Sequence, residues 1–542
     1  MLKKNLLLLI AALGLFLRFY HLGLIPPSLD WDETAHGYNA YSILKTGKDE
    51  YGYKMPLFFR SFDDYKPPLY TYLVVPSVAV FGLNDFAVRF PSALIGVLAV
   101  IFTYLMVYEL FNSKKIAYFA AFFLAVSPWH LQFSRVAFET NSATFFSLLG
   151  TWAFLRALKA KNINITLWFS LTAITFGLSL YLYHNIRVFI PVYSLCLAVI
   201  YFRDIKKILK HLAIPIIIGT LFIIPLFSIV TSVSGLQRFE GTSVFSDKSP
   251  LYKASQQLLE DEQKGQGFIG KIIHNRRLVY VPIVAQNYLS HLRPTFLFIT
   301  ADMNRHHAPL VGLLYIWDIP FLLSGVYFLF SKNFFTKSKL VISSWFLLAP
   351  VAASVTWGVP HALRSEIFLP TFQIFTAIGF VVLLKNIKYK FIVAPIVIIL
   401  LMLNFAFYLY QYHVHMSYEF SKDWLYGRKE AVQITELLKP NYDQVIVSTA
   451  LEQPHEFWLY YTKYDPKKYL SEGGTASGGF LETRNHFDKY KFKPIDFTIQ
   501  KGDGTTLFVG TPSEFPSSVK SIQKIYYLNG EPAIYIVDGN EN

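Results

Sequence analysis

The stretch "SLDWDETAHGYNA" (28–40) places three carboxylates and a histidine directly after a long apolar run. Carboxylates such as Asp32 and Glu33 can take a proton from a reacting group or ligate a metal ion. Ionisable groups beside a bilayer are costly, so several of them together indicate a site. The structural alternative is that Asp32 and Glu33 only begin a helix, where the helix dipole favours acids.

Further ionisable residues collect in short polar segments at the ends of other apolar runs. Arginine and lysine supply donors for a phosphate, and arginine can bind it with two parallel hydrogen bonds. The candidate phosphate ligands are Lys66 in "SFDDYKPPLY", Arg135 in "FSRVAFETN" and Arg364 in "PHALRSE". The candidate substrate or metal ligands are Asp63, Asp64, Glu139, His184 and Arg187 in "YHNIR", Arg305 and His306 in "ADMNRHHAP", and His361, and the same loop adds Asp302 and His307.

Each candidate also has a structural interpretation. Lys66 can extend from an interfacial helix to water, and arginines placed like Arg135 and Arg364 are more often interfacial anchors than ligands. Asp302 with the neighbouring histidines suits a metal ion or a solvated loop. Asp318, inside an apolar run, fits a polar contact within a helix bundle.

The elements that position these residues follow from the composition. Of 542 residues, 53% are hydrophobic and 16% are charged, whereas soluble domains carry about 25% charged residues. Repeated long apolar runs predict a polytopic α-helical membrane protein. The net charge of +14 does not indicate a nucleic-acid partner, because the basic residues lie in short loops between apolar runs. The single cysteine, Cys196, excludes an intramolecular disulfide.

The apolar runs predict about eleven membrane spans. The N-terminal run lacks a small-residue cleavage site and is interpreted as an uncleaved first helix. The run at 67–82 is short and contains Pro76, so it predicts an interfacial or re-entrant helix. The ten further spans are expected near residues 92–111, 116–133, 138–156, 164–183, 188–202, 212–231, 309–331, 340–358, 366–384 and 391–411.

If residues 67–82 span the membrane, the later lysine and arginine clusters of the short loops lie on the opposite side from Lys3 and Lys4. If they do not span it, the clusters all lie on the same side. The positive-inside rule then places the N-terminus in the cytoplasm and the C-terminus outside the plasma membrane. The transmembrane domain is predicted to cover 1–411, with outer loops at 25–91 and 232–308. The candidate residues share the outer face in this topology.

The tail, 412–542, has the composition of a soluble domain. The stretch "RKEAVQITELLK" has a helical pattern, "QVIVSTA" and "TTLFVG" resemble strands, and Asn529-Gly530 is a typical hairpin turn. A small extracytoplasmic α/β domain is predicted.

The order of "DWDETAHGYNAYSIL", "YKPPLYTYLVVPSVAVFG" and "SPWHLQFSRVAFETNSATFF" resembles the membrane glycosyltransferases that use polyprenyl-phosphate sugars. These form the GT-C superfamily, and the likeness is to its protein O-mannosyltransferase and lipid A aminoarabinose transferase branch. It covers residues 1–200 and continues more loosely through "NRHHAPLVGLLY" and "PHALRSEIFLP".

The resemblance implies roles for individual residues. Asp32 matches the family's catalytic base and Glu33 its neighbour, while Lys66 of "KPPL" and Arg135 of the "SR" element match contacts to the donor phosphate. The aminoarabinose branch has an acid directly before "KPPL" that is implicated in metal binding, but this chain has Tyr65 there. Asp64 or Asp63 could take the place of this acid, so the resemblance implies a divalent metal only as a possible cofactor.

The expected function is an inverting transfer of a sugar from a polyprenyl phosphate to a hydroxyl or amine of a protein, lipid or glycan. In-line attack needs one base and no glycosyl-enzyme intermediate. The alternatives are a lipid-linked sugar flippase or transporter, and a non-catalytic glycolipid-binding membrane protein. An oligosaccharyltransferase is a further alternative, but the tail contains no WWD-like motif.

Overall fold

The computed structural model describes residues 2–62, 64–231, 240–331, 334–386, 390–479, 482–500 and 505–540. Its chain divides into two compact units. Unit 1 comprises Met1–Ala11, Ala99–His130 and Ala143–Met402, and unit 2 comprises Ala12–Leu98, Leu131–Ser142 and Leu403–Asn542. Unit 2 therefore combines the tail with parts of the predicted transmembrane domain, so the two units do not divide at residue 411.

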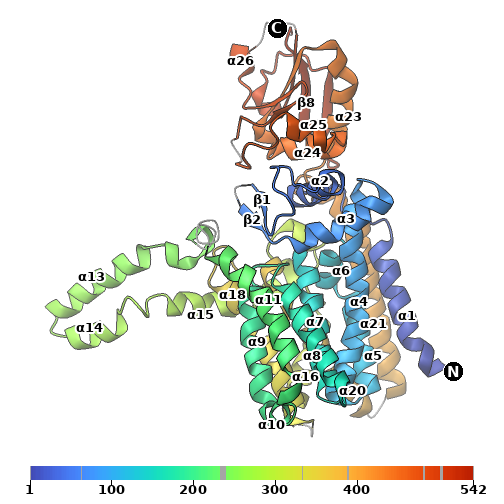
Figure 1. Ribbon diagram of the computed structural model, residues 1–542, viewed down its shortest axis with the longest axis vertical. Helices are drawn as coiled ribbons and strands as arrows, with labels where there is room; N and C mark the ends of the chain where they lie inside the picture. Colours follow the sequence, from blue (N-terminus) through green and yellow to red (C-terminus); the bar gives the residue numbers. More distant parts are fainter. Residues whose placement is uncertain are drawn as a thin grey trace. The chain divides into compact units, whose positions relative to one another are not determined.

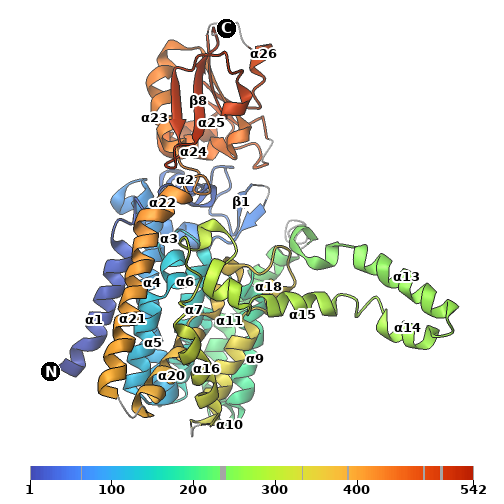
Figure 2. The same cartoon turned by 180° about the vertical axis from the view of Figure 1, so that it is seen from behind.

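Most of unit 1 consists of apolar helices packed against one another, such as α8 against α11 (Figure 1) and α9 against α17. Helix α20 packs against both α5 and α16 (Figure 2). Two glycines permit the close contact of α16 and α20, since a Cβ at Gly325 or Gly379 would meet backbone oxygen within 2 Å. The helices of this unit are the first part of α1 (Leu2–Phe19), the second half of α4 (Asp85–Phe111), α5 (Lys114–Val126), most of α7 (Glu139–Ala157), α8 (Ile163–Ser179), α9 (Ile186–Ile200), α10 (Phe202–Lys206), α11 (Ala213–Val230), α13 (Ser249–Gln263), α14 (Gly267–Ile273), α15 (Val281–Ser290), α16 (Asp318–Ser331), α17 (Thr336–Leu348), α18 (Val351–Ser354), α19 (Ala362–Ser365), α20 (Thr371–Asn386) and most of α21 (Lys390–Tyr410).

Unit 2 contains the segment 25–91, which the sequence predicts as an outer loop, and the tail of the chain. Its helices and strands are the second part of α1 (Leu2–Phe19), α2 (Trp31–Thr46), β1 (Phe59–Ser61), β2 (Asp64–Lys66), α3 (Leu69–Phe81), the first half of α4 (Asp85–Phe111), most of α6 (Pro128–Ser134), α22 (Met416–Glu419), α23 (Arg428–Leu438), β3 (Gln444–Val447), α24 (Pro454–Thr462), α25 (Pro466–Ser471), β4 (His486–Phe487), β5 (Tyr490–Phe492), α26 (Phe497–Gln500), β6 (Thr506–Gly510), β7 (Gln523–Tyr526) and β8 (Pro532–Asp538).

The tail is an α/β fold, as its pattern predicts. Six strands form one sheet in the order β4-β5-β3-β6-β8-β7, in which β3 is parallel to β5 and β6 and the other pairs are antiparallel. The predicted hairpin is confirmed: β7 and β8 flank Gly530, whose φ of 87° suits glycine. Ile446, Phe508 and Val537 from three of the strands pack in the core beside Phe497 and Phe515.

Helix α2 packs against α24 and α25 of the tail in both views (Figures 1 and 2). Gly37 permits this contact, since a Cβ there would lie 2.4 Å from the ring of Tyr460 and 2.8 Å from Val88. Tyr38 donates a hydrogen bond from its hydroxyl to the carbonyl of Tyr464. The tail therefore packs directly on the helix that begins at the "DWDE" segment.

Helices lie at all of the predicted spans, but their lengths vary. Among the described residues, three helices are long and apolar enough to cross a membrane: Asp85–Phe111, Ala213–Val230 and Phe391–Glu419. Two bent pairs raise this number to five, with bends of 58° before α6 and 50° before α20. Pro128 and Pro370 lie at these bends, where proline disfavours a helical conformation of the preceding residue. The count of eleven spans stays a prediction.

Two predicted boundaries differ from the structure. The span expected at 309–331 contains a helix only from Asp318 onward, and residues 309–317 form turns and irregular backbone. The span expected at 340–358 contains α17 and the short α18 instead of one continuous helix. At 67–82, α3 has 13 residues, or about 20 Å of helix, which is shorter than the hydrocarbon core of about 30 Å.

Candidate active site

Asp30, Asp32 and Glu33 lie in the first turn of α2, but in three different environments. Asp30 caps the helix and forms a capping box with Glu33: the Glu33 amide donates to Asp30 Oδ1 at 2.9 Å, and the Asp30 amide donates to Glu33 Oε2 at 3.2 Å. Asp32 points elsewhere, and its side chain is 35% exposed. The adjacent acids are therefore not equivalent.

Glu33 is fully buried and serves as the anion of an internal ion pair. Arg89 donates from Nε to Oε1 and from Nη2 to Oε2, both at 2.9 Å, and the amide of Ala137 donates to Oε1 at 2.9 Å. Arg89 also donates to the carbonyls of Pro26 and Ser28. Glu33 thus connects the start of α2 to α4 and to the segment before α7. Arg89 is therefore the cation that balances Glu33.

Lys66 is the ion-pair partner of Asp32, with Nζ donating to Oδ1. It is the last residue of β2, which pairs with β1 in a short hairpin, and its ammonium lies 4.8 Å from the centre of the Phe62 ring. Burial alone would lower the pKa of Lys66, but Asp32 and then Glu139 raise it above its usual value. The lysine is therefore held as a buried cation beside a half-exposed carboxylate.

His36 and Glu139 form a second polar pair in unit 2. His36 Nε2 lies 3.1 Å from Glu139 Oε1, and His36 Nδ1 lies 2.8 Å from Thr71 Oγ1. His36 follows Asp32 by four residues, a spacing that places two side chains on one helix face. Neither His36 nor Arg89 is among the site residues predicted from the sequence, although the i, i+4 spacing of Asp32 and His36 is a usable signal.

Arg135 is buried, and its guanidinium donates four hydrogen bonds within the described residues. The acceptors are the carbonyls of Leu17, Arg18 and Ile25 and the hydroxyl of Tyr412. These contacts connect the end of α1 to α6 and to the segment after α21. They favour the structural interpretation of Arg135.

The remaining predicted residues belong to other environments. Asp63 lies outside the described residues, and Asp64 belongs to β2. Tyr65 pairs with Arg60 across the hairpin and its ring packs on Phe58, so this position does not supply the acid of the aminoarabinose branch.

In unit 1, Arg187 donates to His184 Nδ1 at 3.1 Å, and Arg364 donates to Thr356 Oγ1 at 2.7 Å and to the carbonyl of Trp357. Arg305 lies in the one-turn helix Asn304–His306, and Asp318 accepts from the amide of Tyr315.

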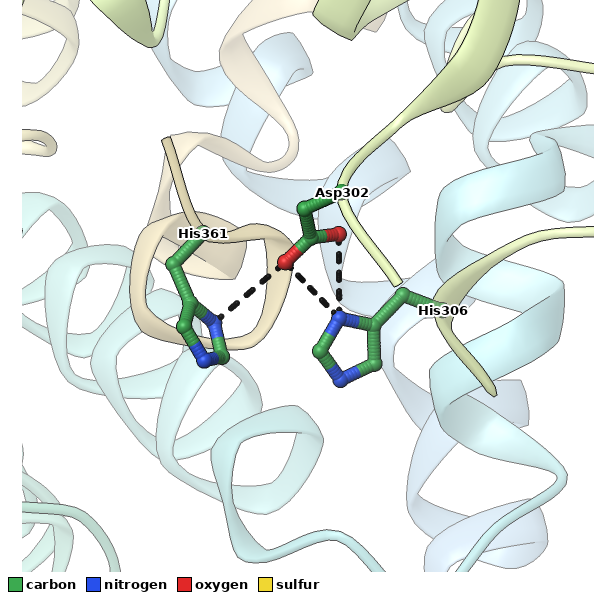
Figure 3. A group of neighbouring side chains, drawn as sticks. All are labelled: Asp302, His306 and His361. Atoms are coloured by element: carbon green, nitrogen blue, oxygen red, sulfur yellow. Dashed lines mark hydrogen bonds and ion pairs between the residues drawn. The ribbon is translucent and has the colours of Figure 1, made fainter. Parts of the chain in front are cut away.

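Asp302, His306 and His361 form a separate cluster in unit 1 (Figure 3). Burial alone would raise the pKa of Asp302, but His306, His361 and the Ala362 amide lower it to about 2. Burial and the neighbouring His306 lower the pKa of His361 to about 3. The cluster therefore contains an ionised carboxylate and a neutral imidazole at pH 7. His307, by contrast, has its Nδ1 2.7 Å from the carbonyl of Ala308 and takes no part in it.

Known proteins similar to this chain agree with this architecture. The family model for dolichyl-phosphate-mannose-protein mannosyltransferases matches residues 65–230. A Bacillus subtilis (strain 168) protein named "Putative mannosyltransferase YkcB" is 27% identical over 164 residues, or 29% of this chain and 21% of its own length. An uncharacterised Aquifex aeolicus (strain VF5) protein is 29% identical over 175 residues, or 32% of this chain and 33% of its own. The chain thus matches a third or less of these relatives.

Two solved structures are similar over most of the chain. ArnT from Cupriavidus metallidurans, bound to undecaprenyl phosphate, has a TM-score of 0.52 at 11% identity and covers 98% of this chain and 97% of its own. The Archaeoglobus fulgidus oligosaccharyltransferase has a TM-score of 0.51 at 15% identity and covers 85% and 63%. The chain therefore has the fold of these two proteins over most of its length. Identities this low show the fold, so the reaction has to be argued from the residues of this chain.

Proposed function

We propose that this protein is an inverting glycosyltransferase that moves a sugar from a polyprenyl-phosphate donor to an acceptor hydroxyl or amine. Asp32 is the general base, and the reaction takes place at the extracytoplasmic face of the plasma membrane. The observation that carries the proposal is the Asp32–Lys66 pair: a half-exposed carboxylate next to a buried ammonium, at the N-terminus of a helix.

Lys66 supplies the charge that the leaving group needs. When the sugar departs, negative charge develops on the polyprenyl phosphate, and a fixed cation in a partly buried site stabilises it. The positive end of the α2 dipole adds to the same field. Glu139 contributes by keeping Lys66 protonated.

Asp32 serves as the base because it is the accessible acid of the pair. Glu33 is fully buried and both of its oxygens accept hydrogen bonds, so it has no open position for an acceptor. Without donor, Lys66 stabilises the anionic form of Asp32 and so weakens it as a base. When the phosphate binds, it competes for Lys66, and Asp32 becomes the stronger base at the moment an acceptor needs deprotonating.

The membrane topology proposed with this function has the N-terminus inside, about eleven spans and the tail outside. The packing of α2 against α24 and α25 supports a role for the tail beside the acceptor, since the helix that begins with the base is held by it. The matched family and ArnT's bound undecaprenyl phosphate support a lipid-linked donor.

The test is a mass-resolved transfer assay with purified full-length protein, a panel of polyprenyl-phosphate sugars and candidate acceptors. One donor should yield a product whose anomeric configuration is inverted. Lys66→Ala should then slow transfer by roughly 30- to 1,000-fold, or about 2–4 kcal/mol of barrier.

Lys429→Ala is the matched control, because Lys429 also pairs with an aspartate of unit 2, Asp85, but its side chain is 51% exposed. The control should retain normal transfer. Equal rates for both lysine variants would refute the phosphate role of Lys66, and donor translocation without transfer would favour a flippase.

A further inference from the structure

Three potential ligands converge in unit 1 from two segments that are far apart in the sequence. Asp302 and His306 lie on the loop that includes Asn304–His306, and His361 directly precedes α19 (Figure 3). Their side chains are only 9%, 5% and 12% exposed. The carboxylate lies between the two imidazoles, so one carboxylate oxygen and both Nδ1 atoms share a small volume.

The separations of these atoms fit a single bound ion. His306 Nδ1 lies 2.9 Å from Asp302 Oδ2, and His361 Nδ1 lies 3.6 Å from the same oxygen. Ligands at about 2.0–2.1 Å around a tetrahedral zinc ion are about 3.3–3.4 Å apart. Small side-chain rotations would therefore bring all three ligands to one metal centre.

One atom of the cluster is not explained by hydrogen bonding. His361 Nδ1 is buried and has no hydrogen-bond partner among the residues that the structure describes, since 3.6 Å to Asp302 is too long for a hydrogen bond. A buried polar atom left this way costs free energy. A cation between His361, His306 and Asp302 would satisfy it.

The surroundings already hold the ligands in place. The amide of Ala362 donates to Asp302 Oδ2 at 3.0 Å, and the amide of His361 donates to Nε2 of His291 at 3.4 Å. His291 in turn has its Nδ1 2.8 Å from the carbonyl of Asn287. Such outer contacts orient metal ligands and are typical of metal sites.

We propose that Asp302, His306 and His361 bind a divalent transition metal ion of the zinc type. Two imidazoles and one carboxylate favour zinc-like ions over magnesium or calcium, which prefer all-oxygen sites. Three protein ligands leave a fourth position for water or an anionic oxygen. The ion cross-links the loop at 302–306 to the start of α19, and this inference does not depend on the proposed transferase reaction.

The test measures metal binding directly. Full-length protein, purified and stripped with a chelator, is titrated with Zn²⁺ by calorimetry, and bound metal is counted by mass spectrometry after dialysis. One equivalent should bind, and excess Mg²⁺ should not displace it. Asp302→Asn and His361→Ala should each weaken Zn²⁺ binding at least about tenfold.

His307→Gln is the matched control, because it removes the adjacent imidazole, which donates to a backbone carbonyl and lies outside the cluster. It should bind Zn²⁺ as the unmodified protein does. Thermal melting without metal verifies that each variant is folded, and Co²⁺ bound at the site should show the visible spectrum of tetrahedral coordination. Unchanged Zn²⁺ affinity in folded Asp302→Asn and His361→Ala, or an equal loss in His307→Gln, would overturn the proposal.

Discussion

Replacing Glu33 by glutamine tests whether the second acid of "DWDE" is structural. The substitution keeps the shape of the side chain but leaves the charge of Arg89 uncompensated, and both side chains are at most 1% exposed. Breaking a buried ion pair by removing one partner costs about 3–5 kcal/mol. Glutamine also replaces one acceptor oxygen by an NH₂ group, which faces the donors of Arg89 and the amides of Ala137 or Asp30. We therefore expect a loss of at least about 3 kcal/mol of stability.

The assay combines the melting temperature of the detergent-purified protein with the transfer rate per folded molecule. Glu33→Gln should melt well below the unmodified protein, and its folded fraction should still transfer sugar. Asp32→Asn is the matched comparison, since its carboxylate is 35% exposed and Glu139 still lies near enough to act on the Lys66 ammonium. It should lower the melting temperature less than Glu33→Gln does.

A double variant isolates the charge. Glu33→Gln combined with Arg89→Met removes both ions, so it should be more stable than the two single losses added together. A Glu33→Gln variant that melts normally but cannot transfer sugar would refute the structural role of Glu33 and identify Glu33 as the base.

Three further predictions concern other parts of the chain. Burial raises the pKa of Glu456 from 4.5 to about 7. The stability that the protonated side chain contributes is therefore present below pH 4.5 and is lost as the pH rises through 7. The free energy of unfolding should fall by about 3 kcal/mol over this range, and Glu456→Gln should flatten the pH profile of thermal melting. Arg135→Ala should lower the melting temperature more than Lys66→Ala does, because it removes four internal hydrogen bonds; the opposite order would restore Arg135 as a phosphate ligand. A reporter that is active only outside the cytoplasm should work when fused after residue 411 and be silent at 114 and 335, whereas activity at 114 would mean that α3 spans the membrane.

Features with a local cause were predictable from the sequence. Apolar runs gave the positions of the helices, and Asn529-Gly530 gave the β7–β8 hairpin, because both signals are contained in a few neighbouring residues. The capping box was also visible, since Asp30 and Glu33 have the spacing that it requires. This spacing predicts that the Glu33 side chain accepts a hydrogen bond at the start of the helix and therefore has a structural role.

Contacts between residues far apart in the sequence were not predictable. Glu33 and Arg89 are 56 residues apart, and His36 and Glu139 are 103 apart, so no local pattern connects them. The sequence predicts Asp302, His306 and His307 as a possible metal set and gives His361 only as a separate candidate for a substrate or metal contact. Only the fold brings His361 to Asp302 and His306 and turns His307 toward a backbone carbonyl.

The central claim is that Asp32 removes the proton from the acceptor, and a single-turnover measurement on Asp32→Asn tests it most directly. Asparagine keeps the size of the side chain but cannot take a proton. With the donor prebound and its affinity measured in the same preparation, the chemical step should slow by roughly 10²- to 10⁴-fold while the donor still binds. A normal transfer rate in folded, donor-bound Asp32→Asn would contradict the assignment of Asp32 as the base.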